Sequence, residues 1–418
     1  MVRGASATIG SLTLRDRRAV SLMSMVAFVF TFAGSLLSYT EPFARNSMDL
    51  SRSAMLGVFT VVRFASLAGV VFAIAADRIG RRRPFLVAFA MLPVGNLVTA
   101  FVPGVVPFAA GQALTRTGLV AVAALTVVIL AEELTPTIRA FGLGIHAVAA
   151  SMGGGLGLMI LPVAESSGDS WRILFALSGV GILLLPLLAR FLGESRAFVR
   201  YPTAVTFRRA LDAGLAPHFW PLAGMAFFIA LFASPSLDLA LERLIVDLAW
   251  DAGAARFVLI VFAGLGAVGL VVGGRLADRV GRRAITLVSL VVGLVGGVAF
   301  YNVSSGWLLA PAVFLATFGA SMLTPAFAAH RAELFPTRVR AMAGGWLTNV
   351  AILGSTTGFL IGALVVDRVG LGITMTVLGA GLFVAMFLVL KLPETRGLDL
   401  VRAGRAGTTM PTSPRERP

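Results

Sequence analysis

The chain has 418 residues, of which 57% are hydrophobic and only 13% are charged. A soluble protein of this length could not bury that much apolar surface, so the mean hydropathy of +0.91 indicates a protein whose solvent is lipid. Because there is no cysteine, and the three histidines (His146, His218 and His330) are far apart in sequence, we expect no disulfide, no metal centre and no cofactor.

The formal net charge of +15 could indicate a nucleic-acid partner. In a membrane protein, however, arginines in short cytoplasmic loops determine the topology, and this interpretation accounts for the charge without any nucleic acid. The first apolar run is too long for a removable signal peptide and lacks a small-residue cleavage site. We therefore expect the lipid bilayer, and no nucleic acid, as a partner of this chain.

Apolar runs long enough to cross a membrane as helices follow one another in two sets of six. The first set lies at about 20–41, 54–75, 84–103, 105–131, 141–163 and 171–192. The second set lies at about 217–238, 255–276, 284–302, 307–329, 342–364 and 370–391. Since about 20 apolar residues span the hydrocarbon core, the sequence predicts an all-α membrane protein with twelve transmembrane helices.

These runs divide the chain into five predicted segments. They are a cytoplasmic N-terminal segment at 1–19, an N-terminal six-helix bundle at 20–192, a cytoplasmic linker at 193–216, a C-terminal six-helix bundle at 217–392 and a cytoplasmic tail at 393–418. The end of the tail is rich in Gly, Thr, Pro and Arg and has no apolar period, which is typical of disorder.

Three motifs occur twice, and their copies are 200 or 201 residues apart. Asp-Arg-x-Gly-Arg-Arg stands at 77–82 and 278–283, Glu-Leu-x-Pro-Thr at 133–137 and 333–337, and Leu-x-Glu-x-Arg at 192–196 and 392–396. This offset indicates the duplication of a unit of about 200 residues, as found in membrane transporters. Turns on the opposite side, at 102–106 and 301–306, carry no charge, so the positive-inside rule places the motifs and both termini in the cytoplasm.

The Gly-x-Leu-Ala-Asp-Arg-x-Gly-Arg-Arg turn at 274–283 resembles the signature of the major facilitator superfamily. The first copy departs from it, with Ala73 and Ala75 where the family usually has glycine and leucine. Segments 333–340 and 393–397 are similar to marks of the sugar-porter branch and its metabolite–proton symporter relatives. The resemblance implies two pseudo-symmetric six-helix bundles and a secondary active transporter of the cell membrane that works by alternating access.

Acids and arginines gather at the cytoplasmic helix ends in both halves of the chain. The resemblance implies that they close the cytoplasmic side of the outward-facing state, and carboxylates with guanidinium groups can form the bidentate bonds this needs. The predicted members of this cytoplasmic gate are Asp77, Arg81, Glu133, Arg139, Glu194, Asp278, Arg282, Glu333, Arg340, Glu394 and Arg396. The alternative is that these charges serve only topology and solubility.

Arg116 is a charge within the fourth apolar run, where an arginine costs about 2.5–3.5 kcal/mol. Gln112 precedes it by one helical turn, and the corresponding residue of the second half is Thr317, so the arginine breaks the symmetry of the repeat. The resemblance implies an acid opposite it in the first helix, and Glu41 follows the expected position, Thr40, by one residue. We hypothesise that Glu41 is the titrating partner of Arg116 and couples proton movement to transport. Alternatively, Glu41 is an interfacial charge at the outer end of its helix.

Other polar or aromatic side chains could line a substrate cavity together with Glu41 and Arg116. They are Tyr39, Gln112, His146, Trp346 and Asn349. His146 could equally be an interior histidine with no role in transport. The Gln-Gln pair of sugar porters is absent from the seventh helix, which argues against a sugar as substrate.

The sequence contains no Gly-x-x-x-x-Gly-Lys-Ser/Thr loop, and its apolar helices offer no catalytic grouping, so we expect no enzyme. The leading hypothesis is a monomeric secondary transporter that moves a small organic solute, a carboxylate or sugar-like metabolite, by proton symport. A proton-coupled drug-efflux antiporter and a non-transporting solute sensor are the alternatives. An unpaired Arg116 would favour an organic anion, whereas an Arg116 neutralised by Glu41 would equally admit a neutral solute.

Overall fold

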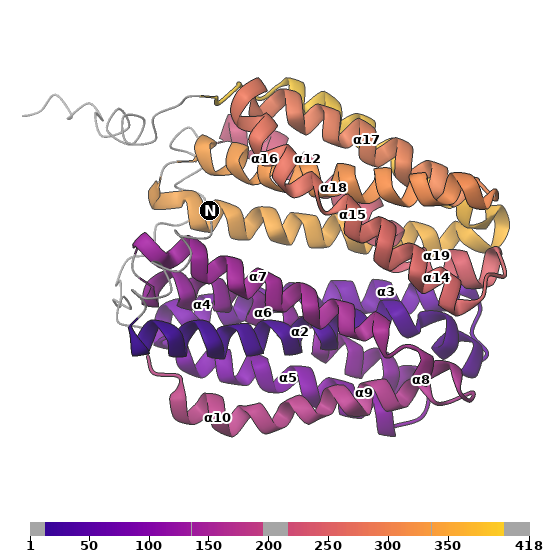
Figure 1. The fold of residues 1–418 in the computed structure, drawn as a ribbon, viewed down its shortest axis with the longest axis horizontal. Coiled ribbons are helices and arrows are strands. Elements are labelled where there is room, and N and C mark those ends of the chain that lie inside the picture. The colour runs from indigo at the N-terminus through magenta and orange to yellow at the C-terminus, as the bar shows by residue number, and fades with distance from the viewer. Residues whose placement is uncertain (1–12, 135, 195–215, 336, 397–418) are drawn as a thin grey trace, which may run out of the picture. The chain divides into compact units, whose positions relative to one another are not determined.

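The computed structural model describes residues 13–134, 136–194, 216–335 and 337–396 (Figure 1). In this part of the chain every regular element is a helix, as the composition predicts. The predicted tail beyond Arg396, most of the predicted linker and residues 1–12 lie outside the described residues.

The first half of the chain forms six membrane-spanning segments. Their helices are α2 (Leu14–Ser47), α3 (Arg52–Ala65), α4 (Gly69–Ile79), α5 (Arg82–Phe101), α6 (Val105–Glu133), α7 (Pro136–Met159), α8 (Pro162–Glu165), α9 (Trp171–Gly179) and α10 (Leu184–Phe191). The short turns η1 (Ser66–Ala68) and η2 (Val180–Leu183) join α3 to α4 and α9 to α10, so that each pair makes one span.

Helix α2 begins six residues before the predicted run because a capping box starts it. The Thr13 hydroxyl accepts the Asp16 backbone N–H at 3.1 Å, and the Asp16 carboxylate accepts the Thr13 N–H at 3.0 Å. These two bonds satisfy backbone donors that a helix N-terminus otherwise leaves unpaired. The first turns of this helix therefore include three arginines that the hydropathy pattern excluded, Arg15, Arg17 and Arg18.

The second half repeats this order with more breaks. Its elements are α12 (Ala216–Asp238), α13 (Ala240–Glu242), the π-helical turn η4 (Arg243–Asp247), α14 (Ala252–Val258), the π-helical turn η5 (Leu259–Ala263), α15 (Gly264–Gly266), α16 (Gly269–Val280), α17 (Arg282–Asn302), α18 (Gly306–Leu334) and α19 (Thr337–Leu390). Gly370 leaves the helical conformation inside α19 (φ 78°, ψ 169°). The described residues hold eleven helices apolar enough to span a membrane, and the break divides the last into two, which gives the twelve predicted spans.

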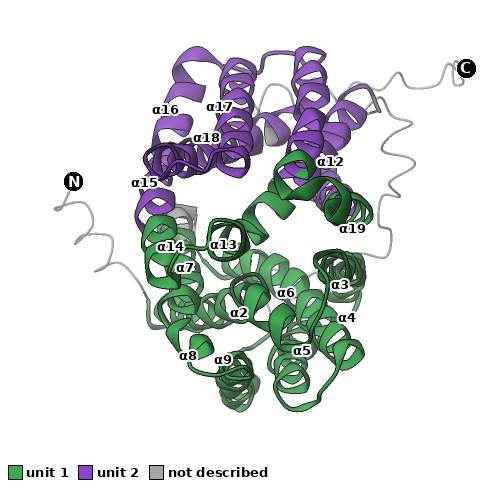
Figure 2. Ribbon diagram, turned by 90° about the vertical axis from the view of Figure 1, so that its right-hand side faces the viewer, with its two compact units in different colours: residues 1–204, 233–260, 355–374 green, residues 205–232, 261–354, 375–418 purple. Residues whose placement is uncertain are grey.

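The chain divides into two compact units whose border does not follow the predicted linker (Figure 2). Unit 1 comprises residues 1–204, 233–260 and 355–374, and unit 2 comprises 205–232, 261–354 and 375–418. Two segments of the second repeat thus belong to unit 1. Ion pairs explain part of this assignment, because acids of segment 233–260 bind arginines of α2 and α3.

Corresponding glycines pack the same two helices together in each repeat. In unit 1, a Cβ atom on Gly95 of α5 would lie 2.4 Å from the Gly111 carbonyl oxygen of α6. In unit 2, a Cβ atom on Gly296 of α17 would lie 2.2 Å from the backbone nitrogen of Ala316 in α18. Gly95 and Gly296 are 201 residues apart. Small residues at such contacts let helices approach closely in lipid, where packing rather than the hydrophobic effect holds them together.

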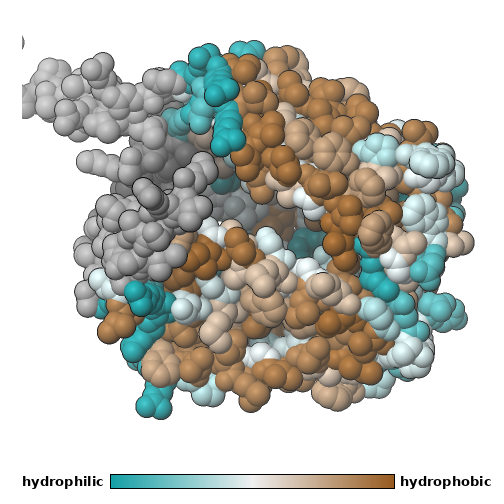
Figure 3. All heavy atoms as spheres, in the orientation of Figure 1, coloured by the Kyte–Doolittle hydropathy of each residue, from teal (hydrophilic) through white to brown (hydrophobic). Residues whose placement is uncertain are grey.

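Large apolar side chains also point outward from the helices. Phe64, Val71 and Phe383, for example, expose 61%, 59% and 64% of their surface. In Figure 3 apolar residues cover most of the face shown, and hydrophilic residues gather toward its ends. This distribution is that of helices whose sides contact lipid.

Candidate functional site

Arg81 organises a set of polar contacts at the end of α4 and the start of α5. Its Nη2 lies 3.0 Å from the Glu132 carboxylate, and its Nη1 lies 2.9 Å from Asp77 and donates to the Ala76 carbonyl oxygen at 2.6 Å. The guanidinium thus joins three neighbouring helices of unit 1. Such bidentate contacts fix the geometry of a turn as well as its charge balance.

Arg282 makes the same contacts in unit 2. Its Nη2 lies 3.0 Å from Glu333 and 2.9 Å from Asp278, and its Nη1 donates to the Ala277 carbonyl oxygen at 2.9 Å. Each partner lies 201 residues after its counterpart in the first repeat. The bonds of Arg81 in the first repeat and of Arg282 in the second therefore agree with the duplication that the sequence predicts.

The predicted gate member Glu133 pairs with an arginine of α2, and its membership of the gate stays a prediction. Glu132 binds Arg81, whereas Glu133 lies 2.7 Å from Arg15 of α2. Glu132, and not Glu133, corresponds to Glu333 in the arginine contacts, because the motif at 133–137 is offset by 200 whereas the arginine turn is offset by 201. One residue turns a helical side chain by about 100°, which is enough to direct it to another partner.

Glu194 and Glu394 cap the helices that follow the two basic turns. Glu194 accepts the backbone N–H of Arg81 at 2.6 Å, and Glu394 accepts those of Arg282 and Arg283 at 2.8 and 3.0 Å. Burial alone would raise the pKa of Glu394, but four backbone N–H groups bind the carboxylate and lower the pKa below its ordinary value. A carboxylate at a helix N-terminus is also stabilised by the helix dipole.

Gly80 and Gly281 make these caps possible. Both have a positive φ, 99° and 132°, which favours glycine. A Cβ atom would also lie 2.3 Å from the Glu194 carboxylate at Gly80 and 2.5 Å from the Glu394 carboxylate at Gly281. Conformation and space thus both require glycine where the turn meets its capping acid.

The remaining predicted members of the gate are less completely described. The side chains of Arg139 and Arg340 lie outside the described residues, and Arg396 contributes its backbone N–H to Glu394 at 3.1 Å. The partners named above for Arg81 and Arg282 belong to the same repeat as the arginine that binds them. The closing of the cytoplasmic side by these groups therefore stays a prediction.

Replacing Glu394 with glutamine is expected to destabilise the folded protein at pH 7 by about 1 kcal/mol, as for the loss of a helix cap. Because the folded-state pKa of Glu394 is lowered, its stabilisation is present above the unfolded-state pKa and is lost as the pH falls through the folded-state pKa. The difference in Tm between the wild type and Glu394→Gln, measured in detergent, should shrink as the pH is lowered. Asp367→Asn, at an exposed acid, is the control; an equal difference at every pH would contradict the assignment.

A buried cluster of acids and arginines lies at the other end of α2. Glu41 of α2 and Glu242 of α13 expose 1% and 0% of their surface. Arg45 lies between them, with Nε 3.3 Å from Glu41 and Nη2 3.5 Å from Glu242. Arg52 of α3 also binds Glu242, at 2.6 Å from Nε. We call Glu41, Glu242, Arg45, Arg52, Arg243 and Asp247 the acid-pair cluster.

Asp247 completes the cluster by binding Arg52 at 2.6 Å and Arg243 at 3.2 Å. The two glutamates nevertheless keep oxygens without a hydrogen bond: both oxygens of Glu41 and Oε2 of Glu242 have no donor among the described residues. Burying an ionised carboxylate without donors is costly, and the cost falls when the group carries a proton. A carboxylate of Glu41 or Glu242 is therefore a chemically suitable site for binding a proton.

Asp238 forms a second buried centre next to this cluster. It accepts the Ser38 hydroxyl at 2.8 Å and pairs with Arg63, whose guanidinium lies 5.5 Å from the ring centre of Phe359. The predicted site residue Tyr39 is half-buried, and its ring packs against α7 where Gly157 leaves room. These groups link α2 and α3 to two segments of the second repeat within unit 1.

The predicted ion pair between Glu41 and Arg116 is not formed. Glu41 is next to Arg45, one helical turn further along α2, and Arg116 makes no hydrogen bond or ion pair with any residue that the structure describes. The physical reason is again rotation, because Glu41 is one residue past Thr40 and so points about 100° away from the expected direction. Arg116 is half-buried in the middle of α6 and remains an uncompensated charge.

Contacts on α6 define the direction in which Arg116 points. Thr115 faces α5, and Leu119 packs against α2. Thr117 donates to a backbone carbonyl at the end of α3 at 3.0 Å. At 100° per residue, Arg116 lies between the α2-facing side of Leu119 and the α3-facing side of Thr117, about 100° from Thr115 and about 40° from Gln112. Its side chain therefore lies on the side of α6 between α2 and α3, next to the face that bonds the buried polar groups of α5.

The predicted site residue Gln112 belongs to those polar groups instead. Its Nε2 donates to Thr99 at 2.8 Å and to Asn96 at 3.2 Å, and Asn96 in turn donates to Ser178 at 2.7 Å. Both hydrogens of the Gln112 amide are thus used inside the helix packing of unit 1. Such a fully bonded buried network fixes helix register and leaves no donor for a substrate.

The other three candidates lie on α7 of unit 1 and in unit 2. His146 is buried in α7, where Nδ1 lies 3.3 Å from the Met23 carbonyl oxygen of α2, the arrangement of an interior histidine. Trp346 and Asn349 belong to unit 2, and Trp346 exposes 45% of its surface. Their role in binding stays a prediction.

Sequence reasoning did not include Glu242 in the site, although a signal for it was present. Glu242 lies 201 residues after Glu41, so the two acids occupy the same position in the two repeats. The same offset that matches Arg81 with Arg282 would have paired them. Their partners Arg45 and Arg52 have no counterpart at this offset, and only the structure identifies them.

Most of the chain is similar to known membrane transporters. Residues 18–205 match the family model described as "Sugar (and other) transporter", and residues 221–414 match the one described as "Major Facilitator Superfamily". The fold is similar to that of the xylose transporter XylE from E. coli in its inward-open conformation, with a TM-score of 0.73 at 17% identity over 93% of this chain and 98% of that one.

Two relatives illustrate the solutes that such proteins carry. A gallate transporter of Pseudomonas putida is 26% identical, over 87% of this chain and 89% of its own. A 3-(3-hydroxy-phenyl)propionate transporter of Escherichia coli is 25% identical, over 85% of this chain and 87% of its own. Both alignments cover most of each chain, so the relatives indicate a class of protein.

Proposed function

The chain belongs to the major facilitator superfamily of membrane transporters, and from this premise we propose that it carries a small organic acid across the cell membrane together with protons. It is a multi-pass transporter of small organic solutes and not an enzyme. Our proposal concerns three further properties: the negative charge of the substrate, its coupling to protons and the direction of its movement.

Arg116 is the observation that carries the proposal. A guanidinium within a membrane-spanning helix costs about 2.5–3.5 kcal/mol, and here no acid among the described residues offsets that cost. A carboxylate ligand would offset it, because guanidinium and carboxylate match each other in charge and in bidentate geometry. An unpaired cation of this kind favours an organic anion over a neutral sugar or a cationic drug.

The named solutes of the relatives support the same class. Gallate and 3-(3-hydroxy-phenyl)propionate are both aromatic carboxylates, and they carry one negative charge at neutral pH. We therefore expect the substrate to combine a carboxylate with a small, partly apolar body.

The proton, in our proposal, binds at the acid-pair cluster. Glu41 and Glu242 face Arg45 and Arg52, and Asp247 and Arg243 complete the charges around them. Two carboxylates in one buried site repel each other when both are ionised, and one proton removes that repulsion. Protonation would also weaken the attraction of Glu242 for Arg52, which ties α3 to the segment after α12.

Weakening these ties is the step that would open the outer end of the transporter. We place both termini and the Arg81 and Arg282 networks in the cytoplasm, which makes the acid-pair cluster the outer side. A proton arriving from outside would then loosen the outer contacts and admit the acid, and its release inside would restore them. Alternating access in this family of folds needs such a reversible contact at each side.

The test is uptake into proteoliposomes of the purified chain, as a monomer, under an inside-alkaline pH gradient. Aromatic and aliphatic carboxylates, their neutral amides, sugars and cationic drugs are compared. We expect gradient-driven uptake of one or more carboxylates and none of their amides. Export of a cationic drug against the proton gradient would overturn the proposal, and so would ligand binding without any flux.

A further inference from the structure

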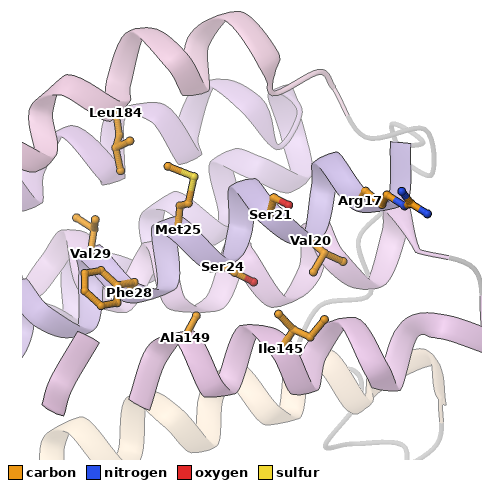
Figure 4. A pocket seen from close by; sticks show the side chains of 10 residues that line it. All are labelled: Arg17, Val20, Ser21, Ser24, Met25, Phe28, Val29, Ile145, Ala149 and Leu184. Carbon is orange, nitrogen blue, oxygen red and sulfur yellow. The ribbon is translucent and has the colours of Figure 1, made fainter. Parts of the chain in front are cut away.

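A groove runs along α2 of unit 1, between α7 and α10 (Figure 4). It has a volume of about 660 Å³ and is lined by Arg17, Val20, Ser21, Ser24, Met25, Phe28, Val29, Ile145, Ala149 and Leu184. Met25 and Ile145 expose 43% and 37% of their surface, so the groove is open along its side. We call it the α2–α7–α10 groove. It shares no residue with the acid-pair cluster and does not include Arg116.

The groove is charged at one end only. Arg17 is exposed, and its guanidinium makes no hydrogen bond or ion pair with the residues that the structure describes, whereas its neighbour Arg15 is bound to Glu133. Arg18 lies over the ring of Phe191, 5.3 Å from its centre. The acid next to it in sequence, Asp16, is buried and bound to Thr13. The mouth of the groove is therefore positive, with a free guanidinium.

A second polar group points into the groove without a partner. The Ser24 hydroxyl oxygen is buried and has no hydrogen-bond partner among the described residues. Ser24 lies on α2 between Arg17 and the apolar end, and Figure 4 places its side chain toward the space between α2 and α7. An unbonded buried hydroxyl is unfavourable, and a ligand oxygen beside it would satisfy it.

Apart from Ser21, the remainder of the lining is apolar, and it has the length of one leaflet. From Arg17 to Phe28 the helix rises about 17 Å, at 1.5 Å per residue. Half of the hydrocarbon core of a bilayer is about 15 Å thick. Met25, Phe28, Val29 and Leu184 therefore lie where lipid chains lie, while Arg17 lies at the level of the headgroups.

We propose that the α2–α7–α10 groove is a binding site for an anionic phospholipid of the cytoplasmic leaflet. The phosphate binds Arg17, a glycerol-ester oxygen accepts the Ser24 hydroxyl, and one acyl chain lies against the apolar lining. Charge complementarity selects this occupant, because the free cation and the unbonded donor both require an anion or acceptor, and the apolar lining requires a chain. The site goes beyond transport and does not depend on which solute the protein carries.

The experiment measures lipid binding to the purified full-length chain by native mass spectrometry and by thermal shift. Phosphatidylglycerol is compared with phosphatidylcholine, in the wild type, in Arg17→Gln and in Ala149→Phe, which fills the groove from α7. Arg368→Gln is the control, since it removes an exposed arginine of α19. We expect phosphatidylglycerol to raise Tm and to bind about fivefold more weakly to Arg17→Gln, the effect of one basic residue on an anionic lipid.

We also expect Ala149→Phe to lose phosphatidylglycerol binding in native mass spectrometry. Phosphatidylcholine should raise the Tm of none of the three proteins. Equal binding of phosphatidylglycerol to the wild type and both variants would overturn the proposal. Phosphatidylglycerol binding that appears only after residues 1–12 are deleted would also overturn it, because the chain itself would then be the occupant. A wild type and Arg17→Gln that differ in lipid binding but transport equally well would leave the proposed transport function unaffected.

Discussion

Replacing Arg116 with glutamine is expected to reduce uptake of the organic acid by about 100-fold or more, because the lost partner is a charge-paired group in a desolvated site. The protein should remain folded, since Arg116 makes no bond with any residue that the structure describes. Its Tm should stay constant or rise, because an arginine at this depth costs about 2.5–3.5 kcal/mol. Initial uptake rates in proteoliposomes and Tm in detergent measure the two effects together.

Arg116→Lys and Arg368→Gln are the matched variants for this prediction. The lysine keeps the charge but loses the bidentate geometry, so uptake should be intermediate. Arg368→Gln removes an exposed arginine of the same charge and should transport as the wild type does. Wild-type uptake by Arg116→Gln would exclude Arg116 from the site. A lower Tm would show instead that the guanidinium stabilises the fold.

Replacing Glu242 with glutamine is expected to uncouple transport from the proton gradient. The glutamine keeps the size and one acceptor oxygen of the side chain but cannot exchange a proton, so an imposed pH gradient should no longer accumulate substrate. Exchange of labelled for unlabelled substrate at equal pH should continue. We expect the same result for Glu41→Gln, because the two acids form one buried site with Arg45 between them.

Glu165→Gln provides the control for this pair. Glu165 pairs with Arg256 in unit 1 but is outside the acid-pair cluster, so its variant should stay coupled. Comparing gradient-driven uptake with exchange in the same proteoliposome preparation separates loss of coupling from loss of transport. If Glu41→Gln and Glu242→Gln both accumulated substrate in full dependence on the pH gradient, the coupling role of this cluster would be excluded.

The helices and their duplication could be predicted from sequence because both depend on patterns along the chain. Apolar runs of spanning length need no partner to be recognised, and the break at Gly370 preserves the predicted number of spans. The offset of 201 also predicts which residues repeat the contacts of Arg81 in the second half. Features that repeat along the chain, such as these, can be read from the sequence alone.

The errors concern rotation and partner choice, which sequence spacing determines poorly. Glu41 follows by one residue the position that the resemblance implies for an acid, and a shift of one residue in a helix turns a side chain by about 100°, so it pairs with Arg45 and not with Arg116. Arg45 and Arg52 could not be assigned to Glu242 because they lie about 190 residues away from it. The Gln112 amide faces α5 because Asn96 and Thr99 bind it there, which the pattern of α6 alone does not reveal.

The central claim is that an organic acid bound through Arg116 enters with a proton, and the pH inside proteoliposomes tests it most directly. A pH-sensitive dye is enclosed, a transported carboxylate is added outside without an imposed gradient, and protein-free liposomes correct for passive permeation. The wild type should acidify the lumen as the acid enters, Glu242→Gln should exchange the acid without acidification, and Arg116→Gln should do neither. Entry of the acid into wild-type proteoliposomes with no change of internal pH, or an equal response to the neutral amide, would contradict the claim.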